Sequence, residues 1–361
     1  MKRVLVVFGA RPSAVKLAPV VHALEARGVQ ADVCLTGQHG EMLECCLEGL
    51  GLRPRYHLRG FSARPLPSRI AGMLVDVGEI LVCSGDFDAV VVVGDTISGL
   101  AGALAGEYAD VPVAHVEAGL RTHQREPWPE EMVRRQIDAC AHWHFAPTVR
   151  AKGNLLAENV SGERLWITGN TIVDSLQKFG FEYSPPETPK VLITIHRREN
   201  WPHIKTIVEQ VRYLASEYSD ASFVWPAHPA IAEKVFGRFK GCNNVLLEYP
   251  LPYEDFMRLM LECSLVITDS GGVQEEASTL GIPNLVVRQC TERPEAIEAG
   301  VSRLVTNPVA LGGAADGLLR YESELAKMRK PTKAFGDGRA GERIAGLMVS
   351  GVTCLGEPAL C

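Results

Sequence analysis

The sequence predicts an α/β protein made of two doubly wound, Rossmann-like domains. Short apolar segments rich in Val and Ile alternate with longer amphipathic segments, as where 89–93 is followed by 96–108. This alternation is typical of a parallel sheet that carries helices on both faces. The chain has 361 residues, whereas a single hydrophobic core stops growing at about 250–300 residues, which favours two domains.

The expected elements of the first half follow from the apolar periodicity and its breaks. Strands are expected over 3–8, 32–35, 89–93 and 111–116, with a last strand ending at 168, and helices over 15–27, 41–50, 70–83, 96–108 and 129–142. Gly28 ends the first of these helices. Residues 53–68 contain Pro54, Pro65 and Pro67, which predicts an irregular segment.

The polar, proline-rich stretch 181–189 (FEYSPPETP) predicts a linker, so the first domain should span 1–180 and the second 181–336. The same alternation then restarts. Strands are expected over 191–195, 222–225, 245–248, 265–268 and 284–287, and helices over 204–218, 253–263, 273–280 and 338–349.

Composition excludes several classes of protein. Lys and Arg number 37 against 43 Asp and Glu, and the formal net charge of −6 argues against binding to nucleic acid or to an anionic membrane. The ten cysteines include no C-x-x-C pair, which disfavours a zinc ribbon or a thioredoxin-like site, and Cys34 and Cys263 sit in apolar stretches typical of a core. The sequence shows no signal peptide and no apolar run of about 20 residues, so we expect a soluble, cytoplasmic protein.

The stretch 265–295 predicts an anion site. An apolar strand is followed by a break and a helix, and free backbone N–H groups at a helix N-terminus suit a phosphate. The residues at this break are Ser270, Gly271 and Gly272. Arg293, in the loop after the next strand, is a candidate for the same anion. Glu275 and Glu276 are expected in the first helical turn, where they either balance the helix dipole or, for one of them, bind ribose hydroxyls.

Polar residues also follow the carboxyl ends of six expected strands, which is where doubly wound sheets bind ligands. These residues are Arg11, Asp95, Glu117, His196, His228 and Ser270. Singly each is a weak signal, since Asp95 before Thr96 also fits a helix cap. The first strand–helix loop has one glycine, Gly9, where a dinucleotide fingerprint needs three, and this disfavours an NAD-dependent dehydrogenase.

Eight blocks of sequence carry a resemblance to a known family. They are GARPSAVKLAP (9–19), GDT (94–96), HVEAGLRT (115–122), PWPEE (127–131), GNTIVD (169–174), HRREN (196–200), TDSGGVQEEA (268–277) and TERPEA (291–296). In this order they resemble the UDP-N-acetylglucosamine 2-epimerase family. Three positions depart from the family pattern: Ser13 stands where Glu is usual, Val133 where Asn is usual, and Trp201 where Gly is usual.

The resemblance implies two Rossmann-like domains facing a cleft, as in glycosyltransferase-B-like proteins, with a C-terminal helix over 337–350 that packs back on the first domain. It also implies a homodimer that acts on a UDP-sugar without a cofactor. No metal is expected, because the carboxylates follow separate strands and no cluster of His, Asp or Cys has the spacing of metal ligands. The catalytic residues it implies are Asp95, Glu117, Glu131 and His196. The substrate-binding residues it implies are Arg11, Lys16, His228, Phe256, Ser270, Gly271, Gly272, Glu276 and Arg293. Phe256 either stacks on uracil or is a core aromatic.

The implied activity is the interconversion of UDP-GlcNAc and UDP-ManNAc at C2, by elimination of UDP and its re-addition to a glycal. Within the same fold, the alternatives are a hydrolysing epimerase that releases ManNAc and UDP, and an epimerase for a related UDP-2-acetamido sugar. A glycosyltransferase would need an acceptor site that no motif marks. A catalytically silent nucleotide-sugar sensor is the alternative from another class, and the presence of Asp95, Glu117 and Glu131 together argues against it.

Overall fold

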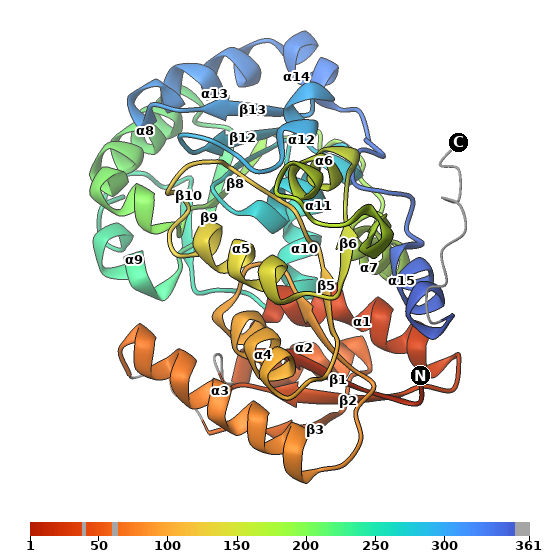
Figure 1. Cartoon of the computed structure of the whole chain (residues 1–361). Coiled ribbons are helices and arrows are strands. Elements are labelled where there is room, and N and C mark those ends of the chain that lie inside the picture. Colours follow the sequence, from red (N-terminus) through yellow and green to blue (C-terminus); the bar gives the residue numbers. More distant parts are fainter. Residues whose placement is uncertain (38–40, 60–63, 351–361) are drawn as a thin grey trace. The chain divides into compact units, whose positions relative to one another are not determined.

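The computed structural model describes residues 1–37, 41–59 and 64–350 and forms two compact units (Figure 1). Unit 1 contains Met1–Phe179 and the chain from Gly336 onwards, and unit 2 contains Gly180–Phe335. Each unit has its own parallel sheet and its own hydrophobic core.

Seven parallel strands form the sheet of unit 1 within the described residues, in the order β3-β2-β1-β4-β5-β6-β7. Their bounds are β1 (Arg3–Phe8), β2 (Gln30–Leu35), β3 (Pro54–His57), β4 (Ala89–Val93), β5 (Val113–Val116), β6 (Trp143–Ala146) and β7 (Leu165–Ile167). The helices are α1 (Arg11–Glu25), α2 (Glu41–Leu50), α3 (Leu66–Cys83), α4 (Ile97–Tyr108), α5 (Glu130–Cys140), α6 (Val149–Ala157), α7 (Thr171–Phe179) and α15 (Ala340–Val349). A short 3₁₀ turn, η1, covers Gly162–Arg164.

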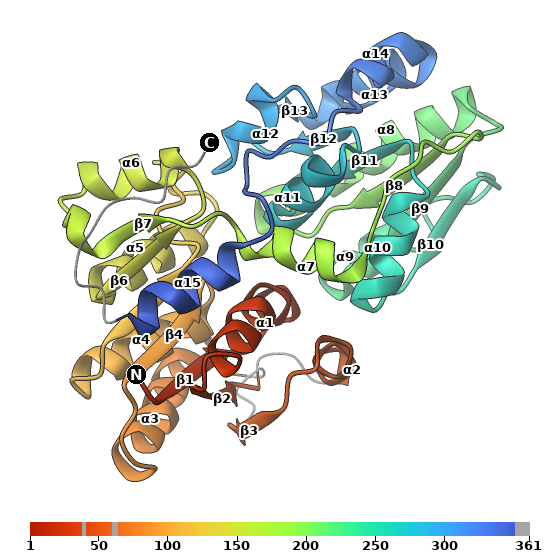
Figure 2. The ribbon, with the colours of Figure 1, turned by 90° about the vertical axis from the view of Figure 1, so that its right-hand side faces the viewer.

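The last described helix, α15, packs against α1 and α7, although more than 150 residues separate it from them in the chain (Figure 2). Its first turn is held by Asp174 of α7, whose carboxylate accepts hydrogen bonds from Ala340 N at 3.1 Å and from Gly341 N at 2.7 Å. A Cβ atom at Gly341 would lie 2.7 Å from the carbonyl oxygen of Pro19, so only glycine allows this approach to α1.

The sheet of unit 2 repeats the same strand order over its described residues, as β10-β9-β8-β11-β12-β13. Its strands are β8 (Lys190–Thr194), β9 (Ser222–Pro226), β10 (Val245–Glu248), β11 (Leu265–Thr268), β12 (Asn284–Val287) and β13 (Ser302–Val305). Its helices are α8 (Ile204–Glu217), α9 (Pro229–Val235), α10 (Tyr253–Leu261), α11 (Gly271–Leu280), α12 (Pro294–Glu298), α13 (Leu311–Arg320) and α14 (Glu322–Met328), with 3₁₀ turns η2 (Arg198–His203) and η3 (Pro308–Ala310).

The prediction of two doubly wound parallel sheets is confirmed. Strands such as β1 and β4 are buried on both faces, which explains why they are continuous apolar runs rather than alternating ones. In each sheet the strand order reverses once, between β1 and β4 in unit 1 and between β8 and β11 in unit 2. Ligands bind at the carboxyl ends of the strands that flank such a reversal.

The expectation of an irregular segment over 53–68 is wrong at both ends. Pro54–His57 forms β3, which pairs with β2 at the edge of the sheet, and an edge strand tolerates a proline because one side of it needs no hydrogen-bond partner. Helix α3 begins at Leu66 with Pro67 in its first turn, where the missing N–H of proline costs nothing. Helices α7, α12, α13 and α14 and strand β13 were not predicted.

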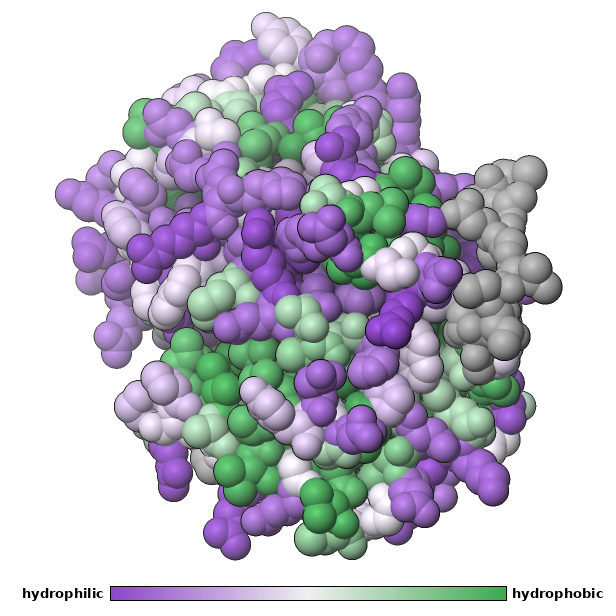
Figure 3. Space-filling model, viewed as in Figure 1, coloured by the Kyte–Doolittle hydropathy of each residue, from purple (hydrophilic) through white to green (hydrophobic). Residues whose placement is uncertain are grey.

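Apolar side chains gather over α3 and α4 on the face of unit 1 that Figure 3 shows. On α3, Val75 is 57% and Val82 is 77% exposed. The expected homodimer stays a prediction.

In the described part of the chain, no helix combines the length and the apolar character needed to cross a bilayer.

Candidate active site

Glu117 lies directly after β5 in the left-handed backbone region, with a φ of +66°. Residues other than glycine seldom adopt this conformation, and those that do gather at functional sites. The side chain is buried, and its Oε1 atom accepts hydrogen bonds from Lys16 Nζ and, at 3.0 Å, from Asn170 Nδ2. A Cβ atom at Gly94 would lie 3.0 Å from Glu117 Oε2. The structure thus brings together Lys16 and Glu117, which the sequence predicted as separate contacts.

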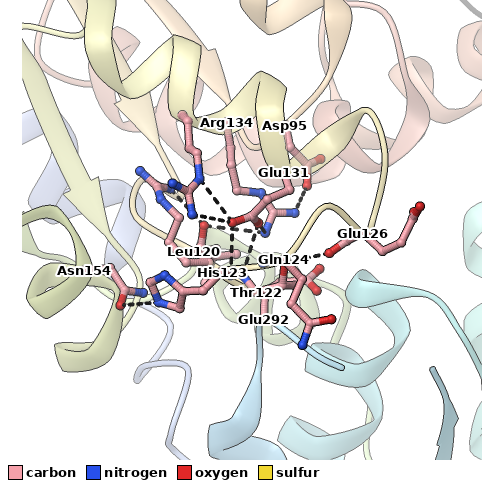
Figure 4. A network of polar contacts seen from close by, with 12 residues as sticks. Asp95, Leu120, Thr122, His123, Gln124, Glu126, Glu131, Arg134, Asn154 and Glu292 are labelled. Carbon is pink, nitrogen blue, oxygen red and sulfur yellow. Dashed lines mark hydrogen bonds and ion pairs between the residues drawn. The ribbon is translucent and has the colours of Figure 1, made fainter. Parts of the chain in front are cut away.

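Asp95 follows β4 and pairs with a buried arginine of α5 (Figure 4). Arg134 Nη2 donates to Asp95 Oδ2, and Arg134 Nη1 donates to Glu131 Oε2 at 3.3 Å. The alternative that Asp95 caps α4 is wrong, because the cap is Thr96, whose side-chain oxygen accepts from Gly99 N at 3.1 Å. Arg134 therefore joins two of the three predicted catalytic carboxylates.

The carboxylate of Glu131 lies at the centre of the network in Figure 4. Its Oε2 accepts from Thr122 N at 3.1 Å, and its Oε1 accepts from His123 N at 3.2 Å and from Arg135 Nη2 at 3.1 Å. Glu131 also lies in the first turn of α5, where a carboxylate suits the helix dipole. With both oxygens in use, Glu131 anchors the preceding loop to α5 and holds Arg134 in place.

Unit 1 holds a second chain of charged side chains, which are buried except for Glu158. His115 Nδ1 lies 2.6 Å from Asp138 Oδ1, and Arg121 Nη2 donates to Asp138 Oδ2 at 2.7 Å and to Glu158 Oε2 at 2.7 Å. Burial acts to raise the pKa of Asp138, but the positive charges of His115 and Arg121 outweigh it and lower this pKa to about 2. Asp138 is therefore ionised at neutral pH.

In unit 2, His196 follows β8 beside the strand-order reversal. The fully buried carboxylate of Asp269, after β11, accepts from His196 N at 3.0 Å, Arg197 N at 2.9 Å and Asn200 Nδ2 at 2.9 Å. Burial lowers the pKa of the His196 imidazole, although 34% of its side chain is exposed, and the nearby Asp269 opposes that shift. Asp269 thus fixes the loop that carries His196. The centres of the His196 and His228 rings are 5.9 Å apart.

The predicted anion site lies at the N-terminus of α11, with Ser270 as the N-cap residue. Its two glycines differ in their surroundings. A Cβ atom at Gly271 would lie 2.5 Å from Nη1 of Arg293, whereas one at Gly272 would meet open space. Only glycine at position 271 allows the Arg293 guanidinium to lie against the start of the helix, so the structure brings together the two parts of the predicted site.

Arg293 is held in this position by two buried glutamates. Its Nε donates to Glu275 Oε1 at 2.6 Å, and its Nη1 pairs with Glu292. Glu275 and Glu276 lie in the second turn of α11, not in the first as expected, because the helix begins at Gly271 rather than at Val273. Glu275 is thus a partner of Arg293. Glu276, the next residue in the chain, is buried, with 5% of its surface exposed.

Of the remaining predicted residues, Arg11 and His228 lie near strand ends, and Phe256 lies within a helix. Arg11 is the first residue of α1, and His228 caps α9 by accepting from Ala230 N at 3.1 Å. Phe256 is half-buried on α10, whose buried residues are Tyr253, Met257 and Met260. Within residues 1–37, 41–59 and 64–350, no group of three or more His, Cys, Asp or Glu side chains could hold a metal ion.

Sequence reasoning missed the residues that hold the candidates in place: Arg134, Asn170, Asp269 and His115. Arg134 lies inside an amphipathic helix, where an arginine is usually solvated, and only its 2% exposure identifies it. The other three belong to the resemblance blocks. Their signal was a polar side chain at the end of, or just after, an apolar strand.

The two doubly wound sheets, each with charged side chains beside its strand-order reversal, define a Rossmann-like protein of the glycosyltransferase-B-like class. The family model for UDP-N-acetylglucosamine 2-epimerase matches residues 22–349. The chain therefore belongs to the UDP-N-acetylglucosamine 2-epimerase family.

Individual relatives are similar over almost their whole length. A protein of Ralstonia solanacearum, described as a probable UDP-N-acetylglucosamine 2-epimerase, is 41% identical over 95% of this chain and 98% of its own. The UDP-N-acetylglucosamine 2-epimerase of Escherichia coli K12 is 38% identical over 95% and 97%. The crystal structure of a Neisseria meningitidis UDP-GlcNAc 2-epimerase bound to UDP-GlcNAc has a TM-score of 0.90 at 35% identity, over 97% of this chain and 100% of that chain.

Proposed function

We propose that this protein is a non-hydrolysing epimerase that interconverts UDP-GlcNAc and UDP-ManNAc at C2. The observation that carries the proposal is a pair of carboxylates, each held by a buried cation, beside the strand-order reversal of unit 1: the buried Glu117 with Lys16, and the partly exposed Asp95 with Arg134. It is supported by the similar Neisseria meningitidis epimerase, which was crystallised with UDP-GlcNAc.

The reaction we propose is an elimination followed by an addition. A base removes the proton from C2 while the bond between C1 and the UDP oxygen breaks, which gives UDP and a C1=C2 glycal. UDP then adds back at C1 while an acid protonates C2 on the opposite face. Because the proton leaves one face and returns to the other, the reaction needs two acid–base groups, and we assign this role to Asp95 and Glu117.

In this proposal the other predicted residues bind and orient. Glu131 keeps Arg134 on Asp95 and fixes the loop before α5; the prediction that it transfers a proton itself stays a prediction. The N-terminus of α11 and Arg293 bind the diphosphate, since N–H groups and a guanidinium stabilise the charge that develops as UDP leaves. His196 assists the departure of UDP, Arg11 and His228 bind phosphate, Phe256 stacks on uracil, and Glu276 accepts hydrogen bonds from the ribose.

Product identification tests the proposal directly. The protein is incubated with UDP-GlcNAc, and the products are followed by proton NMR. A mixture of UDP-GlcNAc and UDP-ManNAc that reaches the same ratio from either sugar supports the proposal. Free ManNAc and UDP would instead establish the hydrolysing reaction, while binding of UDP-GlcNAc without turnover would favour the sensor. Turnover of another UDP-2-acetamido sugar alone would move the proposal to that substrate.

A further inference from the structure

The side chain of His115, on β5, is fully buried and reaches two oxygen atoms. Its Nδ1 lies 2.6 Å from Asp138 Oδ1, and its Nε2 lies 2.8 Å from the carbonyl oxygen of Gly94. Gly94 is the residue between β4 and Asp95. The histidine therefore joins helix α5 to the turn that carries a proposed acid–base group.

The two oxygens determine which nitrogen atoms of the ring carry hydrogen. A backbone carbonyl only accepts hydrogen bonds, so Nε2 must donate to Gly94. An ionised carboxylate also only accepts, and the Arg121 guanidinium, which donates to the other oxygen of Asp138 at 2.7 Å, keeps that carboxylate ionised. Nδ1 must therefore donate as well, which makes His115 an imidazolium between two acceptors.

The charges around this ring alternate in sign. Asp138 lies between His115 and Arg121, and Arg121 in turn donates to the Glu158 carboxylate from Nε at 2.9 Å. The second histidine in this region, His144, bonds through Nε2 to the backbone oxygen of Asp138 at 2.9 Å. A buried imidazolium is thus compensated by a carboxylate, as a buried charge requires.

Gly94 is held by β5 through both of its backbone polar groups. Its N–H donates to Val116 O at 3.0 Å, and its C=O accepts from His115. Gly94 has a φ of +68° and packs against the Glu117 carboxylate: a Cβ atom added to Gly94 would lie 3.0 Å from Glu117 Oε2. Gly94 therefore lies between Asp95, the next residue in the chain, and Glu117, and its orientation sets the spacing of the two carboxylates.

We propose that His115, held as an imidazolium by Asp138, is a positioning residue that fixes the Gly94 carbonyl and thereby the spacing of Asp95 and Glu117. The effect on turnover rests on the proposed function, whereas the protonation state of the ring does not.

Two substitutions separate the donor to Gly94 from the donor to Asp138. A Gln side-chain amide reaches about as far as Nε2 of His, so His115→Gln keeps a donor for Gly94. An Asn amide reaches only about as far as Nδ1, so His115→Asn keeps a donor for Asp138 and loses the one for Gly94. The matched control is His144→Asn, since His144 is also buried and also contacts Asp138, but does not contact Gly94 in the described structure.

The measurements are kcat and KM with UDP-GlcNAc, together with the thermal midpoint of each variant. A carboxylate misplaced by about 1 Å can cost about 100-fold in rate, so we expect His115→Asn to lose about 100-fold in kcat with little change in KM. We expect His115→Gln to retain most of the kcat and His144→Asn to retain all of it. If kcat in the three variants merely follows their thermal midpoints, or if His115→Asn turns over like the wild type, the positioning role is refuted.

Nitrogen-15 NMR of histidine-labelled wild-type protein tests the imidazolium without any assay of activity. At neutral pH, one histidine should show two protonated ring nitrogens, and this signal should be absent from His115→Gln. A single protonated nitrogen at His115 would overturn the inference, even if the protein is an epimerase. If the wild type turns over no UDP-sugar, the proposed function fails and the positioning role fails with it, while the NMR result still decides the protonation state.

Discussion

Replacement of Arg293 gives the sharpest test of the anion site in unit 2. The guanidinium lies against Gly271 at the start of α11, and 4% of the residue is exposed. Arg293→Gln removes the charge while keeping a polar side chain of similar length. Loss of a charge-assisted hydrogen bond costs about 1.5–3 kcal/mol, which corresponds to an increase of about 10- to 150-fold in the Kd for UDP.

The same substitution should also lower stability, because Glu275 loses a buried ion pair with an Nε–Oε1 distance of 2.6 Å. Removal of one partner from a buried pair costs about 3–5 kcal/mol. Adding Glu275→Gln removes the carboxylate charge that Arg293 balanced, so the double variant should recover part of the stability that the single variant loses. Glu292 also contacts Arg288 at 2.7 Å, and neither substitution removes that partner.

Calorimetric titration with UDP and thermal unfolding of both variants separate the two effects. We expect weak UDP binding in both, with the lowest thermal midpoint in Arg293→Gln. The control Arg320→Gln removes an exposed arginine from α13 of the same unit and should change neither quantity. Unchanged UDP affinity in a folded Arg293→Gln protein would remove Arg293 from the site. Recovery of affinity together with stability in the double variant would show that the single variant lost binding only through its fold.

Three further results are expected. Asp95→Asn and Glu117→Gln should each lower kcat by about 10²–10⁴-fold while UDP still binds by calorimetry, and full turnover in either would exclude that residue from the acid–base pair. Glu131→Gln should also lower kcat, because it loosens Arg134 beside Asp95, and full turnover in this variant would refute that role. Turnover should persist in EDTA, because guanidinium groups and a helix N-terminus stabilise the leaving diphosphate, and a loss that Mg²⁺ restores would contradict this. Burial lowers the pKa of His144 and of His196 in the folded protein, so the unfolded chain binds more protons below about pH 6.5. The thermal midpoint of His144→Asn should therefore fall less than that of the wild type as the pH decreases through that value; an equal change in the two proteins would refute the burial argument.

The fold was largely predictable because its parallel strands are buried on both faces. Runs such as Val4–Val7 and Val90–Val93 contain only apolar residues, so their pattern is strong and their positions were clear. The edge strand β3 alternates in burial and begins with a proline, and no local pattern distinguished it from a loop. Helix α12 has only five residues, too few to show a helical period.

The candidate site was predictable where function places polar residues at strand ends, as for Asp95, Glu117 and Ser270. Its supporting contacts were not predictable, because they depend on distance in space. Arg134 reaches Asp95 across 39 positions of sequence, and its spacing on α5 gives no sign of that contact. Asp269 looked like a residue that merely ends a strand, yet it accepts two backbone N–H groups from the His196 loop.

Solvent exchange at C2 tests the central claim most directly. If the C2–H bond breaks while UDP leaves and returns, the reaction in D₂O must place deuterium at C2 of UDP-ManNAc. The UDP-GlcNAc pool should also gain deuterium at C2 as the two sugars equilibrate, which proton NMR and mass spectrometry both detect. UDP-ManNAc that forms in D₂O but keeps its original hydrogen at C2 would contradict the elimination and addition proposed for this protein.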